Sequence, residues 1–275
     1  MNTVKEKWLN KVNDKVINLQ NNIWTFSDKL HHDIFSQEEC FLTEQELKAK
    51  TVFISLTDDR YQRYQTFSEY INDKTEWPDD PEIQKLYSQG VISCMKWKDA
   101  PLMKTTTDLA ILNMLIWELK PGCIVEIGSG NGSSAEYFSD ITQVYKLNTK
   151  IVTFDINPVQ KQYERVSYNY GDCNNIETFN CIEKFIDKDK PTLFVEDAHV
   201  NVSGTLKKLL TYAKPGDYFF VEDGALKQKE LQEVMSSQGL YLDRYYLDFF
   251  GKNSSSSMNG IFKVTFDFMS QDDYS

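Results

Sequence analysis

The stretch CIVEIGSGNGSS at residues 123–134 decides the fold of this chain. It begins with a short apolar run over 123–128, which predicts a buried strand, and it continues directly into a turn that contains three glycines. A helix is expected to follow at about 131–146. Glycine lets the backbone turn tightly and approach a ligand closely. This order of strand, glycine turn and helix predicts the ligand-binding end of an open α/β sheet.

Strands and helices alternate on both sides of this stretch. A helix is expected at 105–119, before the first strand. The later strands are expected at 150–155 (KIVTFD), 166–172 (VSYNYGD), 192–197 (TLFVED) and 217–223 (DYFFVED), with helices near 175–186, 202–213 and 226–237. Such alternation predicts a parallel, doubly wound sheet.

The C-terminal part departs from this alternation. YLDRYYLDFF at 241–250 and IFKVTFDF at 261–268 predict two strands of an antiparallel hairpin, with Ser254–Ser257 in a flexible loop between them. A mainly parallel sheet with a terminal antiparallel hairpin is typical of class I methyltransferases and unusual for dinucleotide dehydrogenases. We therefore expect an α/β protein with a Rossmann-like sheet of seven strands.

The N-terminal third shows a different pattern. Apolar residues recur at helical spacing near the start, Thr43–Glu46 forms a capping box, and a third helix is expected over 59–72. The breaker-rich segment EWPDDPE at 76–82 indicates a boundary. We expect a helical extension over 1–90, acting as a cap, a lid or an oligomerisation surface, and a methyltransferase domain over 91–275.

Composition narrows the classes of partner. The chain has 30 basic and 41 acidic residues and a formal charge of −11, which argues against a nucleic-acid or anionic-membrane binder. Its five cysteines show no C-x-x-C spacing, which favours a reducing compartment. The N-terminus has no apolar signal core, and the most apolar run, 109–117, is too short to span a bilayer. A soluble cytoplasmic protein is the simplest interpretation.

The glycine turn also indicates the cofactor. Its spacing is G-x-G-x-G rather than G-x-G-x-x-G, which favours S-adenosylmethionine over NAD. Asp155 ends the next strand, where an acid accepts hydrogen bonds from ribose hydroxyls, and Asp172 ends the third, where an acid meets the adenine amine; either could instead cap a helix. The residues expected to contact the cofactor are Glu126, Gly128, Ser129, Gly130, Asn131, Gly132, Ser133, Ser134, Asp155, Asp172 and Glu196.

Four stretches carry a family resemblance that covers roughly 90–265. They are MKWKDAPLMKTTTDLAILNMLIWELKPGCIVEIGSGNGSSAEYF, NYGDCNNIETF, FVEDAHVNVSG and KPGDYFFVEDG. Together they resemble the cephalosporin hydroxylase and rhamnosyl/macrolide O-methyltransferase group, and within it the cephalosporin hydroxylases of the cephamycin pathway. The resemblance implies a class I methyltransferase fold, the use of S-adenosylmethionine and, as in several members, Mg²⁺.

The resemblance also implies a metal site on Glu196, Glu222 and Asp223, which follow two neighbouring strands. The first position is usually aspartate in the family, so Glu196 is a departure, and Asp197 could serve instead. Carboxylates are hard ligands suited to Mg²⁺, and acids clustered at adjacent strand ends repel one another without a cation. The alternative is that some of these acids only cap the helices that follow.

His199 lies three residues after Glu196, where catechol-type methyltransferases carry the lysine that takes the substrate proton. A neutral imidazole suits a general base near pH 7, and the alternative is a structural histidine. Trp97, Lys104 and the N-terminal helices are expected to shape the acceptor pocket.

The resulting hypothesis is an S-adenosylmethionine-dependent and Mg²⁺-dependent O-methyltransferase that acts on a hydroxyl of a small specialised metabolite and assembles as a homo-oligomer. Two alternatives remain: an N-methyltransferase, and a cofactor-binding accessory subunit to a partner oxygenase. Hydroxylation by this chain alone is disfavoured because no facial triad with two histidines is visible. An NAD-dependent oxidoreductase is disfavoured by the glycine spacing and the terminal hairpin.

Overall fold

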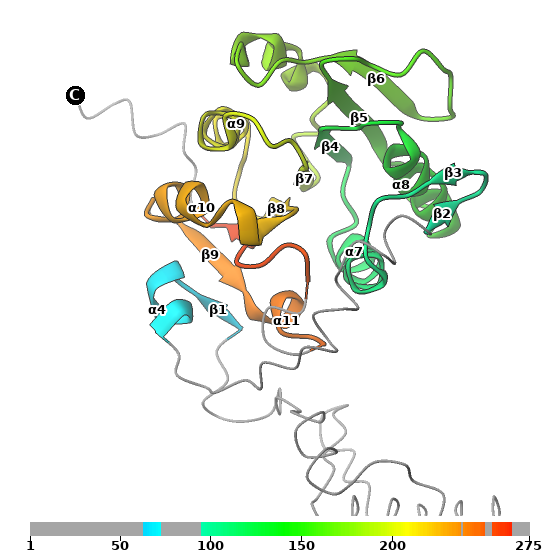
Figure 1. Ribbon diagram of the computed structural model, residues 1–275. Helices are drawn as coiled ribbons and strands as arrows, with labels where there is room; N and C mark the ends of the chain where they lie inside the picture. Colours follow the sequence, from blue (N-terminus) through cyan, green and yellow to red (C-terminus); the bar gives the residue numbers. More distant parts are fainter. Residues whose placement is uncertain (1–62, 73–94, 238, 251–254, 266–275) are drawn as a thin grey trace, which may run out of the picture. The chain divides into compact units, whose positions relative to one another are not determined.

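A mixed sheet of eight strands lies at the centre of the residues that the computed structural model describes, 63–72, 95–237, 239–250 and 255–265 (Figure 1). The strands are β1 (Tyr64–Gln65), β4 (Cys123–Ile127), β5 (Lys150–Asp155), β6 (Val166–Tyr170), β7 (Thr192–Glu196), β8 (Tyr218–Val221), β9 (Leu240–Asp243) and β10 (Ile261–Val264). Their order across the sheet is β1-β9-β10-β8-β7-β4-β5-β6, and a separate small hairpin joins β2 (Lys96–Trp97) to β3 (Ala100–Pro101).

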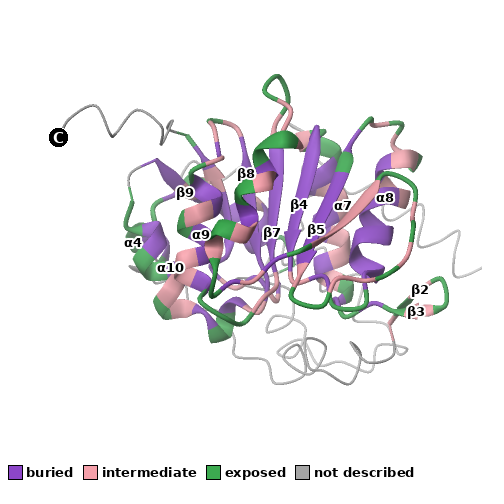
Figure 2. Cartoon of the chain, turned by 90° about the horizontal axis from the view of Figure 1, so that it is seen from above, coloured by how far each residue is buried: buried purple, intermediate pink, exposed green. Residues whose placement is uncertain are grey.

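The middle of the sheet is parallel, as the alternation of strands and helices predicts. β4 lies between β5 and β7, so that Ile124 has Ile151 on one side and Leu193 on the other. Every residue of β4, β7 and β8 is buried. These strands are apolar along their whole length because helices cover both faces of the sheet. Figure 2 shows the same burial of the central strands, with the exposed residues lying mainly around them.

Figure 1 shows α7 and α8 on one side of the sheet and α9 and α10 on the other. The helices are α4 (Phe67–Asn72), α7 (Thr106–Leu119), α8 (Ser133–Val144), α9 (Val202–Leu210), α10 (Gln228–Met235) and α11 (Arg244–Leu247), with 3₁₀ helices η1 (Ile176–Lys184) and η2 (Gly224–Leu226). None of these helices is long and apolar enough to cross a membrane. The predicted class of fold, a doubly wound α/β sheet, is confirmed.

The C-terminal part of the sheet differs in detail from the sequence-based expectation. β9 and β10 pair antiparallel, but the strand expected over 241–250 ends at Asp243 and a short helix follows. The Asp243 carboxylate caps that helix by accepting a hydrogen bond from the backbone N–H of Tyr245 at 3.1 Å. Ser255 and Ser257 are buried, so the expectation of a flexible loop is wrong for these two residues.

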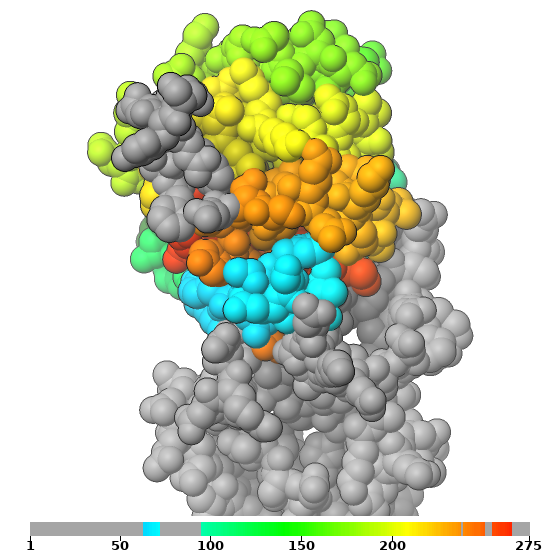
Figure 3. Space-filling view, turned by 90° about the vertical axis from the view of Figure 1, so that its left-hand side faces the viewer, coloured from blue at the N-terminus to red at the C-terminus, as the bar shows by residue number. Residues whose placement is uncertain are grey.

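An eighth strand comes from the region that was expected to be a helical extension. Of the residues from 63 on in the helix expected over 59–72, only Phe67–Asn72 are helical, and β1 before them pairs antiparallel with β9. Arg63 fixes this strand, because its Nη2 lies 2.9 Å from Oδ2 of the buried Asp243. Figure 3 shows the segment (cyan) against α10 and β9 (orange). The other predictions for 1–62 and 73–90 lie outside the described residues, and the division at residue 90 stays a prediction.

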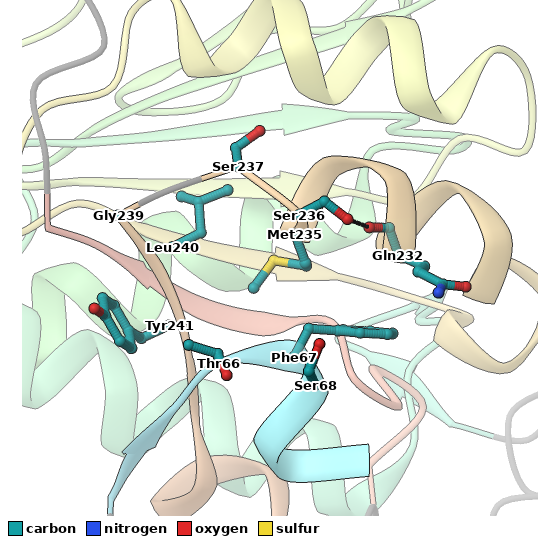
Figure 4. Close-up of a pocket in the computed structure, with 10 residues that line it drawn as sticks. All are labelled: Thr66, Phe67, Ser68, Gln232, Met235, Ser236, Ser237, Gly239, Leu240 and Tyr241. Carbon is teal, nitrogen blue, oxygen red and sulfur yellow. Dashed lines mark hydrogen bonds between the residues drawn. The ribbon is translucent and has the colours of Figure 1, made fainter. Parts of the chain in front are cut away.

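A pocket of about 480 Å³ lies between α4, the end of α10 and the start of β9, with Phe67 and Met235 in its lining (Figure 4). α10 begins near the carboxyl ends of the parallel strands and runs away from them. The pocket is therefore at the opposite end of the sheet from the residues that the sequence singles out.

Candidate functional site

The glycine turn after β4 adopts backbone angles that favour glycine. Gly128, Gly130 and Gly132 have φ values of +95°, +49° and +79°. A Cβ atom on Gly128 would lie 2.8 Å from the backbone carbonyl carbon of Asp197, whereas one on Gly130 would meet nothing within 4 Å. The turn therefore packs directly on the end of β7 and leaves open space beside Gly130.

Asp155 is the last residue of β5, as expected, whereas the strand expected over 166–172 ends at Tyr170 and Asp172 lies two residues beyond it. Asp155 accepts a hydrogen bond from the Gly130 N–H at 2.9 Å and another from the Asn157 N–H at 2.8 Å. Asp172 accepts one from the Asn174 N–H at 2.9 Å. Both acids thus order local turns, and Asp155 holds the glycine turn to the neighbouring strand. Their expected contacts with ribose and adenine remain predictions.

Buried polar atoms without partners lie beside the glycine turn. Glu126 accepts a hydrogen bond from Thr153 Oγ1 at 2.8 Å through Oε2, but its Oε1 has no hydrogen-bond partner among the described residues. The same holds for Ser129 Oγ and for the Tyr168 hydroxyl, which lies on the strand next to Thr153. Such atoms need a polar partner. They fit a ligand rich in amine and hydroxyl groups, as S-adenosylmethionine is.

Three side chains converge beyond β7 and β8. Ligand atoms of Asp197, His199 and Asp223 all lie within 4.8 Å of one another. His199 Nε2 is 3.3 Å from Asp223 Oδ2, and both side chains are about half exposed. We call these three residues the acid cluster. It adjoins the glycine turn, because the backbone of Asp197 is the surface on which Gly128 packs.

The two glutamates of the predicted metal site are held differently. Lys227 Nζ lies 2.8 Å from Glu196 Oε2, and Lys104 Nζ forms an ion pair with Glu222 and lies 3.5 Å from Asp197 Oδ2. Both lysines and both glutamates are buried. The described residues therefore do not bring Glu196, Glu222 and Asp223 together as one set of ligands. Asp197, the alternative to Glu196, lies beside Asp223 instead.

Sequence reasoning missed Lys227 altogether. It lies just beyond the predicted ligand Asp223, at the start of the helix expected near 226–237, and a lone lysine there carries no signal that it is buried. The ammonium group of Lys104 lies among the acids, and the expected role of this residue in the acceptor pocket stays a prediction. Trp97 is anchored to α8, because its Nε1 donates to Asp140 Oδ2 at 2.8 Å and its ring packs edge-on against Tyr137.

Burial and mutual repulsion disfavour the charged forms of the acids. Burial raises the pKa of Glu196 to about 7, although Lys227 opposes the shift. Burial also raises the pKa of Glu222 and Asp197, with Lys104 opposing in both cases. For Lys104 itself, burial lowers the pKa, but the nearby carboxylates outweigh burial and raise it, so its ammonium form persists.

The acid cluster offers oxygen ligands to a cation. Its carboxylates belong to Asp197 and Asp223, while the buried Lys104 and Lys227 pair with Glu222 and Glu196. The oxygens of Asp197 and Asp223 are the hard ligands that Mg²⁺ prefers. These two carboxylates lie together in the acid cluster. The residues present therefore fit a hard divalent cation at the acid cluster.

The parallel sheet with a terminal antiparallel pair, the G-x-G-x-G turn and the adjoining acids define a class I methyltransferase. Comparison with protein families gives the particular group. The sequence model described as "Rhamnosyl O-methyltransferase/CmcI" matches residues 89–240, more than half of the chain. The chain belongs to this family, and it is an S-adenosylmethionine-dependent methyltransferase. The family and enzyme class predicted from the sequence are thereby confirmed.

Solved structures of CmcI share the fold. CmcI in its apo form has a TM-score of 0.54 and 20% identity, with 83% of this chain and 97% of that chain covered. CmcI with Mg and S-adenosylmethionine gives 0.54 and 21%, with coverages of 85% and 99%. CmcI with S-adenosylhomocysteine gives 0.52 and 20%, with coverages of 75% and 95%. A comparison with curated proteins found no match.

Proposed function

We propose that this methyltransferase transfers the methyl group of S-adenosylmethionine to a hydroxyl of a small specialised metabolite, with Mg²⁺ held by Asp197 and Asp223. The observation that supports the proposal most directly is the convergence of Asp197, His199 and Asp223 within 4.8 Å, beside the end of β7 against which the glycine turn packs. Donor and acceptor would then meet at one edge of the sheet. Positioning of this kind supplies a large part of the rate in group transfer.

The cofactor would lie over the glycine turn. The open space at Gly130 admits the ligand, and Asp155 keeps the turn in place through the Gly130 N–H. Glu126 and Ser129 offer buried polar atoms that lack partners in the described part of the chain. S-adenosylmethionine supplies an electrophilic methyl group when it is bound there.

The acceptor would lie over the acid cluster. A divalent cation held by Asp197 and Asp223 supplies positive charge that lowers the pKa of an acceptor hydroxyl. His199 is half exposed, so an acceptor can reach it, and its contact with Asp223 orients the imidazole ring. We propose His199 as the general base that takes the hydroxyl proton. Asp223 then stabilises the imidazolium that results.

Calorimetric titration tests the metal site without knowledge of the acceptor. Mg²⁺ is titrated into the chain saturated with S-adenosylhomocysteine, for the wild type and for Asp197→Asn, Asp223→Asn and Glu196→Gln. We expect the two aspartate variants to lose Mg²⁺ binding and Glu196→Gln to retain it. Loss in Glu196→Gln with retention in Asp197→Asn would instead restore the ligand set predicted from the sequence.

Methyl transfer to a panel of small hydroxylated and amino compounds tests the reaction. We expect products methylated on oxygen, formed with Mg²⁺ and suppressed by excess chelator. Products methylated on nitrogen, or full activity in chelator, would contradict the proposal. No transfer to any acceptor, combined with tight S-adenosylhomocysteine binding, would favour the accessory-subunit alternative.

The surroundings of the enzyme are part of the same proposal. We propose a small-molecule acceptor, no nucleic-acid or membrane partner, a cytoplasmic location and a homo-oligomer. The N-terminal extension over 1–90 stays part of this proposal, with β1 inside it pairing with β9. Light scattering on the full chain tests the oligomer, and a monomer at micromolar concentration would contradict it.

A further inference from the structure

The segment 101–108, which we call the bridging segment, contacts both the glycine turn and the carboxylates beyond it. At its start, the backbone carbonyl of Pro101 accepts a hydrogen bond from Asn131 Nδ2 at 2.9 Å and another from Ser133 Oγ. Asn131 belongs to the glycine turn, and Ser133 begins α8. A displacement of the turn therefore also displaces Pro101.

The middle of the bridging segment has little freedom to absorb such a displacement. Leu102 is buried, and its N–H donates to the Met95 carbonyl at 2.9 Å. The N–H of Lys104 donates to the Leu102 carbonyl at 2.9 Å, and Thr105 forms the capping box of α7 with Asp108. The backbone is thus fixed on both sides of Lys104.

Lys104 carries the connection into the acids. Its side chain is 1% exposed, and its ammonium group pairs with Glu222 after β8 and lies 3.5 Å from Asp197 after β7. These two carboxylates follow neighbouring strands. One ammonium group therefore links the carboxylates at two neighbouring strand ends, and Asp197 is a member of the acid cluster.

A chain of hydrogen bonds links the end of the bridging segment to the same acids. Asp108 is buried, and its Oδ1 accepts hydrogen bonds from Ser255 Oγ at 2.7 Å and from the Ser256 N–H at 3.0 Å. The Ser256 carbonyl in turn accepts the Gly224 N–H at 2.8 Å. Gly224 directly follows Asp223, so the bridging segment reaches the acid cluster from a second side.

We propose that the bridging segment couples occupancy of the glycine turn to occupancy of the acid cluster, with Lys104 as the positioning residue that joins the two. The inference rests on the proposed function, because it takes S-adenosylmethionine at one site and a divalent cation at the other. Cofactor binding at the turn fixes the position of Pro101, and Pro101 fixes the position of the Lys104 backbone. The Lys104 ammonium group then fixes the positions of the Asp197 and Glu222 carboxylates. In this proposal Lys104 acts through Asp197 and Glu222.

The coupling is a measurable ratio. Calorimetry gives the dissociation constant of S-adenosylhomocysteine with and without saturating Mg²⁺, and that of Mg²⁺ with and without saturating S-adenosylhomocysteine. Linkage requires both ratios to be equal. When two sites are coupled, one ligand typically changes the dissociation constant of the other by about fivefold or more. We expect a wild-type ratio of at least about fivefold and a ratio within about twofold of one for Lys104→Met. Lys104→Arg should keep much of the coupling, because a guanidinium group can bind both carboxylates.

The matched control is Lys214→Met. Lys214 Nζ lies 3.4 Å from the buried Asp217, before β8 and away from the glycine turn. This variant removes a lysine from an ion pair without touching the bridging segment, so its coupling ratio should equal that of the wild type. If Lys104→Met fails to fold in a thermal melt, Asn131→Ala replaces it. That change breaks the side-chain hydrogen bond to Pro101 and should also reduce the ratio.

The outcomes separate the two proposals. A wild type that binds neither ligand overturns the proposed function and the coupling together. A wild type that binds both with a ratio of one overturns the coupling alone. An unchanged ratio in a folded Lys104→Met, or an equal loss in Lys214→Met, shows that the ammonium group does not join the sites.

Discussion

Gly128→Ala tests whether the site needs the glycine turn to pack closely against the end of β7. The new Cβ atom would lie 2.8 Å from the carbonyl carbon and oxygen of Asp197 and 2.9 Å from the Ala198 nitrogen. All three contacts are with backbone, which has no rotamer to change. Either the turn or the β7 end must move, and Asp197 moves with it.

The expected loss of stability has two parts. A side chain at the Gly128 φ of +95° costs about 1–2 kcal/mol, because L residues avoid this region. The overpacked contact adds about 1–3 kcal/mol. We therefore expect the free energy of unfolding to fall by about 2–5 kcal/mol, with weaker binding of both S-adenosylhomocysteine and Mg²⁺.

Gly216→Ala is a matched control for the first part. Gly216 has nearly the same φ, +97°, but a Cβ atom there would meet nothing within 4 Å. Urea unfolding of the two variants, followed by circular dichroism, isolates the contact with Asp197 as the difference between them. If Gly128→Ala is no less stable than Gly216→Ala and binds both ligands normally, close packing of the turn on Asp197 does not shape the site.

Three further predictions concern other parts of the molecule. His199→Gln should slow single-turnover methyl transfer by about 10²–10⁴-fold while S-adenosylhomocysteine affinity stays unchanged, and a wild-type rate would remove His199 from the mechanism. Burial raises the pKa of Cys123 from its ordinary value near 9 to about 12. Between pH 9 and pH 12 the Cys123 thiol therefore keeps its proton in the folded state and loses it in the unfolded state. Stability should fall there by up to about 1.4 kcal/mol per pH unit for this group, and Cys123→Ala should make the fall in urea midpoints shallower. Asp108→Ala removes the α7 capping box and the hydrogen bonds to Ser255 and Ser256. It should lower the free energy of unfolding, measured by thermal or urea unfolding, by about 2–4 kcal/mol. A decrease below about 0.5 kcal/mol would show that these hydrogen bonds do not hold the segment in place.

Local sequence patterns were sufficient for the central sheet and the cofactor turn. The strand expected at 150–155 has those bounds in the structure, and β4 differs from its expected range by one residue. These strands are buried on both faces, so their apolar runs are unbroken and easy to delimit. The glycines at 128, 130 and 132 all have positive φ, which is the property that makes such a turn visible in a sequence.

Patterns failed where pairing with a distant segment decides the local structure. β1 has two residues and no apolar alternation, and it exists because β9 offers a free edge and Arg63 reaches the buried Asp243. The strand expected over 241–250 stops at Asp243, whose carboxylate caps the following helix and also binds the distant side chains of Arg63 and Tyr218. β1 and β9 lie far apart in the sequence, so no window along the chain contains both strands.

The sequence by itself determined the family, the class of fold and the edge of the sheet at which the acids gather. Only the tertiary structure decided which of two adjacent acids, Glu196 or Asp197, lies with Asp223. Glu196 is the last residue of β7 and is buried against Lys227, whereas Asp197 lies beyond the strand under Gly128. Successive side chains point in different directions at a strand end. The packing that brings Lys227 to one of them arises from the helices after β8, and no local pattern contains it.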